Sequence, residues 1–223
     1  MNHHIAMIHT VPALADRFHT MIGERYPSGN RPRIDHVVDP WLLAEAIRSG
    51  VTEEVVDRVG AHAAYLASQG AELIMITCSS VGGTAALAAE RSGVPVLRVD
   101  APMAAEAVRL ADGGTITVLG TLSSTLEPTA ELVRGSVGVL DGPEPHIRAV
   151  LVEGAAAARS TGDAERHDEL VKAAVADASG ESAVVVLAQA SMASALEGVA
   201  TAVPVLSSPA SGVQSIVDAL QKR

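Results

Sequence analysis

The sequence predicts an α/β protein of two pseudo-symmetric lobes, each a mostly parallel sheet flanked by helices. Three observations predict this class: short apolar runs alternate with Ala-rich stretches of helical spacing, the two halves of the chain repeat each other, and aromatic residues make up only 2% of the sequence. A core built from Ala, Val, Leu and Ile is typical of the layers between helices and a parallel sheet.

Short apolar runs bounded by turn residues have the length and composition of buried strands. They cover residues 5–8, 34–38, 73–76, 94–97, 116–119, 149–152, 183–187 and 203–206. Stretches with helical spacing cover residues 52–69, 84–91, 104–111, 164–178 and 211–221. This alternation predicts parallel sheets joined by crossover helices.

The two halves of the chain share a sequence pattern. Three segment pairs match in the same order: residues 7–10 with 118–121, 71–80 with 182–191, and 94–97 with 203–206. The first two pairs share one offset, which aligns Cys78 with Gln189, and the third repeats Val-Pro-Val-Leu letter for letter at a slightly shorter offset. Three ordered matches indicate an internal duplication.

The duplication predicts the domain organisation. We expect lobe one to comprise residues 1–98 and 209–223, and lobe two to comprise residues 99–208. The carboxyl ends of parallel strands form the usual binding crevice of such folds. We therefore expect a small-molecule site between the lobes, with Cys78 opposite Gln189.

Composition disfavours several classes of partner and location. A net charge of -10 disfavours binding to nucleic acid or to an anionic membrane surface. The single cysteine rules out an internal disulfide and favours a cytoplasmic location, as does an N-terminus without signal-peptide features. The most apolar segment, residues 183–206, is interrupted by Gln189, Glu197 and Pro204, so we expect no membrane span.

Cys78 is the first candidate for chemistry. It ends a predicted buried strand and precedes the turn Ser79-Ser-Val-Gly-Gly83 and an Ala-rich helix. Free amides and the positive dipole end of a helix stabilise a thiolate, which would make the sulfur a base or nucleophile. The alternative is a buried cysteine that acts as a small apolar filler.

Two further candidates lie at corresponding strand ends. Gln189, in the matching position of lobe two, can donate and accept hydrogen bonds but cannot take up a proton, and it would otherwise satisfy backbone groups of its loop. His9, at the end of the first strand, is placed for acid/base work, with a histidine bonded to backbone groups as the alternative. The other seven histidines are expected at terminal, loop or solvated-helix positions.

Hydroxyl residues gather at the predicted strand-to-helix turns, where hydroxyls and free amides can bind a carboxylate. The candidates for substrate binding are Thr10, Ser79, Ser80, Thr121, Ser124, Thr125 and Ser191. A capping box, Ser124-Thr-Leu-Glu127, would explain some of them structurally. No histidine spacing typical of a metal site and no Gly-x-Gly-x-x-Gly motif occurs, so we expect neither a metal nor a nucleotide cofactor.

With these residues placed, the chain resembles the aspartate/glutamate racemase superfamily, which also includes hydantoin racemases, maleate isomerases and arylmalonate decarboxylase. The resemblance spans nearly the whole chain and rests on four segments: Ile8-His-Thr-Val-Pro12, Cys78-Ser-Ser80, Leu119-Gly-Thr121 and Leu187-Ala-Gln-Ala-Ser-Met192. It implies a two-lobed fold with the substrate between the lobes, no cofactor, and a homodimer.

The resemblance also implies where this chain departs from the family. Racemases of this kind use two cysteines on opposite faces of the carbon next to a carboxylate, and Gln189 stands at the second position. Ser79 and Ser80 stand where glutamate racemases have Asn-Thr. The two-thiol mechanism therefore does not transfer to this chain.

The sequence thus predicts an isomerase in which Cys78 transfers a proton at the carbon next to the carboxylate of a small substrate. His9 is the expected second acid/base. Two alternatives stay open. One is a one-base decarboxylase in which Cys78 protonates a carbanion and Gln189 is a neutral contact. The other is a non-catalytic protein that binds small carboxylates.

Overall fold

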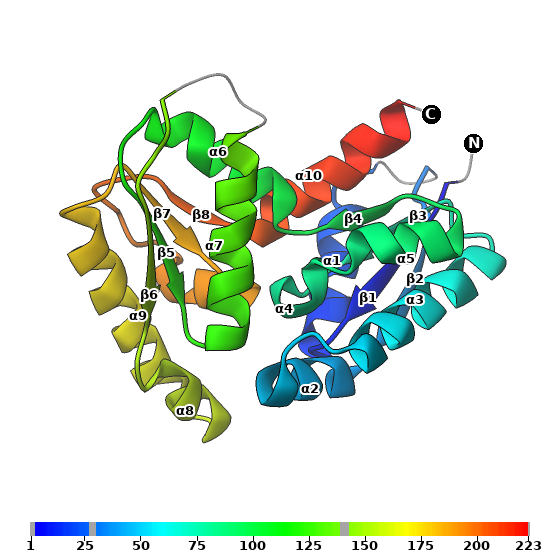
Figure 1. Ribbon diagram of the computed structural model, residues 1–223, viewed down its shortest axis with the longest axis horizontal. Helices are drawn as coiled ribbons and strands as arrows, with labels where there is room; N and C mark the ends of the chain where they lie inside the picture. The colour runs from blue at the N-terminus through cyan, green and yellow to red at the C-terminus, as the bar shows by residue number, and fades with distance from the viewer. Residues whose placement is uncertain (1–2, 27–29, 139–142, 223) are drawn as a thin grey trace. The chain divides into compact units, whose positions relative to one another are not determined.

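The computed structural model describes residues 3–26, 30–138 and 143–222. The chain divides into two compact units, Met1–Val99 with Pro209–Arg223, and Asp100–Ser208. Each unit contains a four-stranded sheet in which all described strand pairs are parallel, with helices on both faces (Figure 1). The predicted fold class is confirmed.

In the first unit the strand order is β2-β1-β3-β4. The strands are β1 (His4–His9), β2 (Arg33–Val38), β3 (Leu73–Ile76) and β4 (Val96–Arg98). The helices are α1 (Ala13–Gly23), α2 (Pro40–Ser49), α3 (Glu53–Ser68), α4 (Ser79–Gly82), α5 (Ala85–Ser92) and α10 (Ser208–Gln221). The last helix packs on this sheet through Val213 and Ile216.

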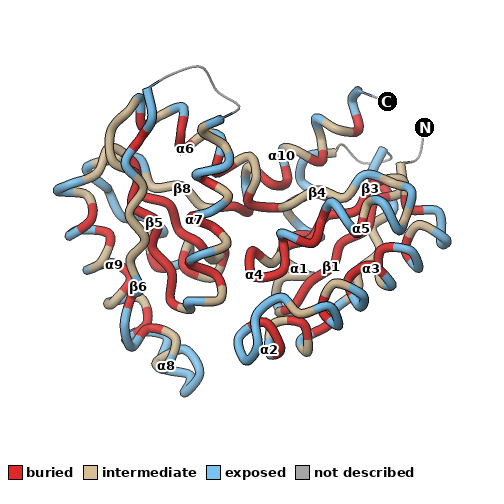
Figure 2. Tube along the Cα trace, viewed as in Figure 1, coloured by how far each residue is buried: buried red, intermediate tan, exposed pale blue. Residues whose placement is uncertain are grey.

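Alternate residues of the central strands enter two separate cores. Ile8 and Ile76 pack with apolar residues of α2, α3, α4 and α5, whereas Met7 and Met75 pack with residues of α1 and α10. Because both faces are covered, the interiors of the central strands β1 and β3 are apolar, and Figure 2 shows these two strands as buried.

The second unit repeats this arrangement with the strand order β6-β5-β7-β8. The strands are β5 (Ile116–Gly120), β6 (Ile147–Leu151), β7 (Val184–Leu187) and β8 (Val205–Ser207). The helices are α6 (Ala101–Ala111), α7 (Ser123–Val137), α8 (Ala155–Ser160), α9 (Ala164–Ser179) and the 3-10 helix η1 (Ala190–Leu196). Helices α6 and α7 cover one face, and α8, α9 and η1 cover the other.

The strand register reproduces the spacing of the sequence repeat. The corresponding pairs are Ile5 with Leu73 and Ile116 with Val184, then Met75 with Leu97 and Val186 with Leu206. Ile5, Leu73 and Met75 correspond to Ile116, Val184 and Val186 at the same offset as the sequence repeat. Leu97 corresponds to Leu206 at the slightly shorter offset of the Val-Pro-Val-Leu pair. The duplication seen in the sequence is therefore present in the hydrogen-bonded sheets.

Helices α1, α2, α7 and α8 lie outside the stretches that the sequence pattern predicted as helical. Helix α7 is the clearest case, because Ser, Thr and Gly residues and an internal Pro128 lower its intrinsic helix propensity. Its apolar face, with Ala130 and Val133 fully buried, holds it against the sheet. Tertiary packing thus outweighs local propensity there.

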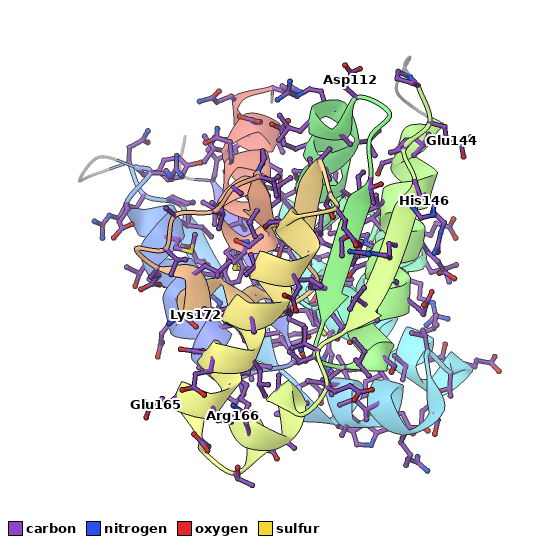
Figure 3. All side chains as sticks on the ribbon, turned by 90° about the vertical axis from the view of Figure 1, so that its left-hand side faces the viewer. Asp112, Glu144, His146, Glu165, Arg166 and Lys172 are labelled. Atoms are coloured by element: carbon purple, nitrogen blue, oxygen red, sulfur yellow. The ribbon has the colours of Figure 1, made fainter. Side chains whose placement is uncertain are left out.

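Helix α9 begins in the charged run of residues 163–169. Asp163 caps the helix by accepting a hydrogen bond from the backbone N–H of Arg166 at 3.0 Å. Glu165, Arg166 and Lys172 are exposed, and Figure 3 shows their side chains on the outer side of the helix. None of the helices in the described ranges has both the length and the hydropathy needed to cross a membrane.

Candidate functional site

Cys78 lies where β3 meets α4. It occupies the N-cap position of α4 with an extended backbone (φ -119°, ψ 119°), and its thiol is free and half-buried. The side chain packs, partly buried, against the core cluster that α2, α3, α4 and α5 contribute to. Within the described residues Sγ makes no hydrogen bond. Cys78 is therefore neither fully buried nor used to cap its helix.

His9 ends β1, the strand next to β3 in the same sheet. Its ring is fully buried, and both of its nitrogens have partners. Nδ1 lies 2.8 Å from the hydroxyl of Thr77, and Nε2 lies 2.9 Å from Nδ1 of His36. Burial and the nearby His36 lower the pKa of His9 to about 4. His9 is therefore neutral at pH 7, and direct contact with a substrate requires one of these hydrogen bonds to open.

His36 extends the contact from His9 toward solvent. Its Nε2 lies 3.1 Å from Nδ1 of His19, an exposed residue of α1. Burial and the neighbouring His19 lower the pKa of His36, while the carboxylates of Asp16 and Asp35 act in the opposite direction. Three imidazoles thus form a continuous chain, which we call the histidine chain (His9, His36 and His19).

Two of the histidine placements expected from the sequence are wrong. His36 is a half-buried strand residue because it stands beside Met7 in the sheet register and faces α1, not solvent. His167, expected on a solvated helix face, is 1% exposed because that side of α9 enters the core, and its Nδ1 contacts Asp168 at 2.8 Å. Side chains alternate along a strand, so His9 lies on the same face of β1 as Met7, the partner of His36 in the parallel register. This alternation was the sequence signal that could have predicted the contact of His9 with His36.

Gln189 occupies in the second unit the place that Cys78 has in the first. It is the N-cap of η1 with a closely similar backbone (φ -129°, ψ 133°). Its Oε1 accepts hydrogen bonds from the backbone N–H of Thr121 at 2.7 Å and from the Thr121 hydroxyl at 2.9 Å. Because a backbone N–H can only donate, the oxygen must face Thr121, and this fixes the orientation of the amide.

This contact changes the roles expected for the pair. Thr121 directs its N–H and its hydroxyl to Gln189, not to a ligand. The Nε2 group of Gln189 retains two N–H donors with no partner among the described residues. Gln189 therefore presents hydrogen-bond donors and no base.

The remaining predicted residues lie in the turns that follow the strands. Thr10 and Ser79 in the first unit, and Ser191 in the second, have hydroxyls with no hydrogen-bond partner among the described residues. Ser80 and Thr125 are buried at the starts of α4 and α7, and both have an interaction partner. These hydroxyls share the carboxyl-terminal edges of their own sheets.

Ser124 differs from the capping box that the sequence suggested. Helix α7 begins at Ser123 with Leu122 as its N-cap, so Ser124 lies inside the first turn. The reason is that only Thr121 and Leu122 separate the end of β5 from the helix. The Ser124 hydroxyl oxygen is buried and has no hydrogen-bond partner in the described part of the chain. The capping-box interpretation is therefore wrong.

A charged cluster that the sequence analysis missed lies at the end of β2. Asp39 is 6% exposed, and its Oδ2 lies 2.6 Å from Nε of Arg58 and 2.6 Å from Nε2 of His62. The Arg58 guanidinium stacks on Trp41 at 4.8 Å. Burial raises the pKa of Asp39, but hydrogen bonds from Arg58 and His62 outweigh it and hold the pKa below its usual value.

The geometry of both units shows no metal centre in residues 3–26, 30–138 and 143–222: no three His, Cys, Asp or Glu side chains converge as ligands there. The histidine chain runs in line, with each imidazole bonded to the next. The side chains at the two sheet edges therefore offer a thiol, imidazoles, hydroxyls, an amide and the paired charges of Asp39 and Arg58.

Several solved structures share the fold of this chain. The chain has the fold of a Yersinia pestis protein described as an Asp/Glu racemase (TM-score 0.75, 15% identity, 98% of this chain and 99% of that chain covered). It also has the fold of a glutamate racemase isoform from Bacillus anthracis (0.71, 16%, 99% and 82%) and of a mutant of arylmalonate decarboxylase (0.54, 18%, 96% and 91%). No curated protein matches the sequence.

These structural likenesses concern the fold alone, because the identities are low. The family model for Asp/Glu/hydantoin racemase matches residues 30–216, which is most of the chain. That match agrees with the two parallel sheets and their duplicated register. The chain belongs to the Asp/Glu/hydantoin racemase family.

Proposed function

We propose that this protein is a cofactor-independent isomerase in which Cys78 transfers a proton at the carbon next to the carboxylate of a small substrate. The observation that supports it is the placement of Cys78: the thiol stands at a strand end, half-exposed and without a hydrogen-bond partner in the described residues. Family membership supports the reaction class.

In this proposal the Cys78 thiolate removes the proton from that carbon. The C–H bond breaks, an S–H bond forms, and the electron pair spreads onto the carboxylate as an enediolate. The enediolate electron pair then forms a new C–H bond with a proton given up by the Cys78 S–H or by protonated His9, and the carboxylate is restored. Donors aimed at the developing charge contribute most to such reactions. At the sheet edge that carries Cys78, the donors proposed are the hydroxyls of Thr10 and Ser79. In the second unit, the donor proposed is the Nε2 group of Gln189, which has two N–H bonds without a partner in the described residues.

His9 is the second acid/base of the proposal. This role is supported by the position of His9 at the end of β1, the strand that pairs with β3 and so ends beside Cys78. Because both imidazole nitrogens are bonded, one of these hydrogen bonds opens before His9 exchanges a proton with the substrate. Gln189 adds a donor and no second thiol, so the reaction proposed has one sulfur and no two-thiol step.

A second candidate is a one-base decarboxylase. Loss of carbon dioxide would generate the carbanion, Cys78 would protonate it, and Gln189 would be a neutral contact. The observation that favours it is the amide in place of a titratable group at position 189. The likeness to arylmalonate decarboxylase is one of fold only.

One assay separates the candidates. The protein is incubated in deuterated buffer with a panel of amino acids, hydroxy acids, hydantoins and malonates, and proton NMR follows deuterium incorporation and products. We expect incorporation at the carbon next to the carboxylate without loss of carbon. Carbon dioxide release would favour the decarboxylase. Ligand-induced thermal shifts across the panel without incorporation or product would contradict both and favour a binding protein.

A further inference from the structure

A line of three histidines crosses the first unit from its buried sheet edge to its surface. His9 is 0% exposed, His36 is half-buried and His19 is exposed. The links are short, at 2.8 Å from Thr77 to His9, 2.9 Å from His9 to His36 and 3.1 Å from His36 to His19. Each link between rings joins Nε2 of one ring to Nδ1 of the next, so the chain has one direction throughout.

We infer that the histidine chain is a proton relay that connects His9 to solvent, with His36 as the positioning residue that fixes the tautomer of His9. The inference rests on the proposed function only in its last step, where His9 uses the relayed proton as an acid. The hydrogen-bonded relay itself exists without substrate. It assigns a role to His36 and His19, neither of which the proposed chemistry needs as a reacting group.

The hydrogen bonds specify a resting arrangement of protons. The Thr77 hydroxyl lies 3.2 Å from the carbonyl oxygen of Ile8 and donates to it, so it accepts from Nδ1–H of His9. His9 Nε2 then accepts from Nδ1–H of His36, and His36 Nε2 accepts from Nδ1–H of His19. In its neutral form, each of the three rings therefore carries its proton on Nδ1.

Proton transfer along this chain balances at every step. A hydronium ion in the solvent protonates Nε2 of His19 and leaves a water molecule, and the Nδ1 proton of His19 passes to Nε2 of His36. The Nδ1 proton of His36 then passes to Nε2 of His9, which becomes an imidazolium bonded to Thr77. No oxidant, metal or further reactant is needed. Three transfers thus move one positive charge from the surface to the buried end of β1.

The groups around His9 make its imidazolium form short-lived. The charged groups that act on the middle of the chain are Asp16 of α1 and Asp35 of β2, and both stabilise a proton on His36. On the other side of His9 lie the aromatic ring of Phe18 and the neutral Thr77. Burial keeps the pKa of His9 at about 4, so the imidazolium there is a strong acid.

The first test uses NMR and no substrate. Long-range nitrogen-proton correlation spectra of histidine-labelled protein at pH 7 report the tautomer of each ring. We expect His9 and His36 both in the Nδ1–H form. Opposite tautomers on the two rings would place two N–H groups or two lone pairs at the 2.9 Å contact, and that result would overturn the relay.

The second test uses variants that cut the chain at different links. An Asn side chain places its amide where Nδ1 of histidine lies, so His36→Asn keeps a partner for His9 but loses the contact to His19. His19→Asn keeps a partner for His36 but cannot titrate. The matched control is His146→Asn, because His146 is an exposed histidine of the other unit. Thermal unfolding of each variant checks the fold.

The readout is the ratio of deuterium incorporated to product formed, measured in deuterated buffer with a substrate identified from the panel. Cutting the relay slows exchange of the held proton with solvent, so the ratio falls in His36→Asn and His19→Asn by about tenfold, less than the roughly 100-fold cost of removing an acid/base group outright. Added imidazole should restore it, and His146→Asn should leave it unchanged.

The outcomes separate this inference from the proposed function. Matching tautomers, a lower ratio in both variants and rescue by imidazole support the relay. An unchanged ratio in both folded variants overturns it, and the proposed role of Cys78 then stands. Full turnover by Cys78→Ala would overturn the proposed function, while the NMR result would still decide the relay.

Discussion

Replacing His9 by a side chain that does not titrate should remove a large part of the acid sensitivity of this protein. His9 is buried, and its pKa is lowered from 6.5 to about 4 by burial and by His36. A proton therefore binds His9 more tightly in the unfolded chain than in the folded one. The stability linked to His9 is complete above pH 6.5 and is lost as the pH falls toward 4.

The magnitude follows from these two pKa values. A difference of about 2.5 pKa units corresponds to about 3 kcal/mol, and the part lost between pH 7 and pH 5 is about 2 kcal/mol. The carboxyl groups with lowered pKa values, such as Asp35 and Asp39, lose their stabilising contribution at lower pH, below the ordinary range of a carboxyl group. The interval from pH 7 to pH 5 therefore isolates the histidines.

The assay is urea unfolding of the wild-type protein and of His9→Gln at pH 7, 6 and 5. Gln can still donate to Thr77 or accept from His36, and it stays neutral throughout. We expect the free energy of unfolding of the wild type to fall by about 2 kcal/mol more than that of the variant over this interval. Parallel curves for the two proteins, with His146→Gln as a surface control, would refute the argument from burial.

Three further outcomes test the packing and the amide. Gly212→Ala should destabilise the protein by about 1–3 kcal/mol, because a Cβ there would lie 2.8 Å from the carbonyl oxygen of Val99, whereas Gly135→Ala, with open space around it, should be neutral or stabilising in the same thermal melts. Equal melting temperatures for the two would contradict this packing. Gln189→Glu retains acceptors for Thr121 but replaces the free N–H donors with a negative oxygen, so kcat/KM for an anionic substrate should fall at least about tenfold with little change in stability. Gln189→Leu leaves the Thr121 N–H unpaired and should lower the unfolding free energy by about 1–3 kcal/mol, and a variant as stable as the wild type in urea would show that the bond contributes nothing.

The sheets were predictable from the sequence because their central strands β1, β3, β5 and β7 are buried on both faces and the outer strands are partly buried. Such strands appear as continuous apolar runs, and all eight predicted runs overlap strands of the structure. The duplication was visible because buried strands and strand ends keep their pattern, as the constant offset between β1 and β5 and between β3 and β7 shows. The helices were less predictable, since α7 depends on packing more than on the propensity of its own residues.

The site was predictable only as far as strand ends could be located. Cys78 and Gln189 were placed at matching turns, and both are N-caps in the structure. The contacts of Gln189 with Thr121 and of His9 with His36 join residues that are far apart in the chain. Such contacts depend on the order and register of strands, which a local pattern does not contain. His36 was accordingly assigned to solvent although its strand had been predicted.

The most direct measurement of the central claim compares wild-type protein with Cys78→Ala and Cys78→Ser. The rate of deuterium incorporation at the carbon next to the carboxylate is measured at saturating substrate, with circular dichroism to confirm the fold. Loss of an acid/base group lowers such rates by about 10²–10⁴-fold. We predict a loss in this range for Cys78→Ala and a partial loss for Cys78→Ser. Incorporation at the wild-type rate by folded Cys78→Ala would contradict the account.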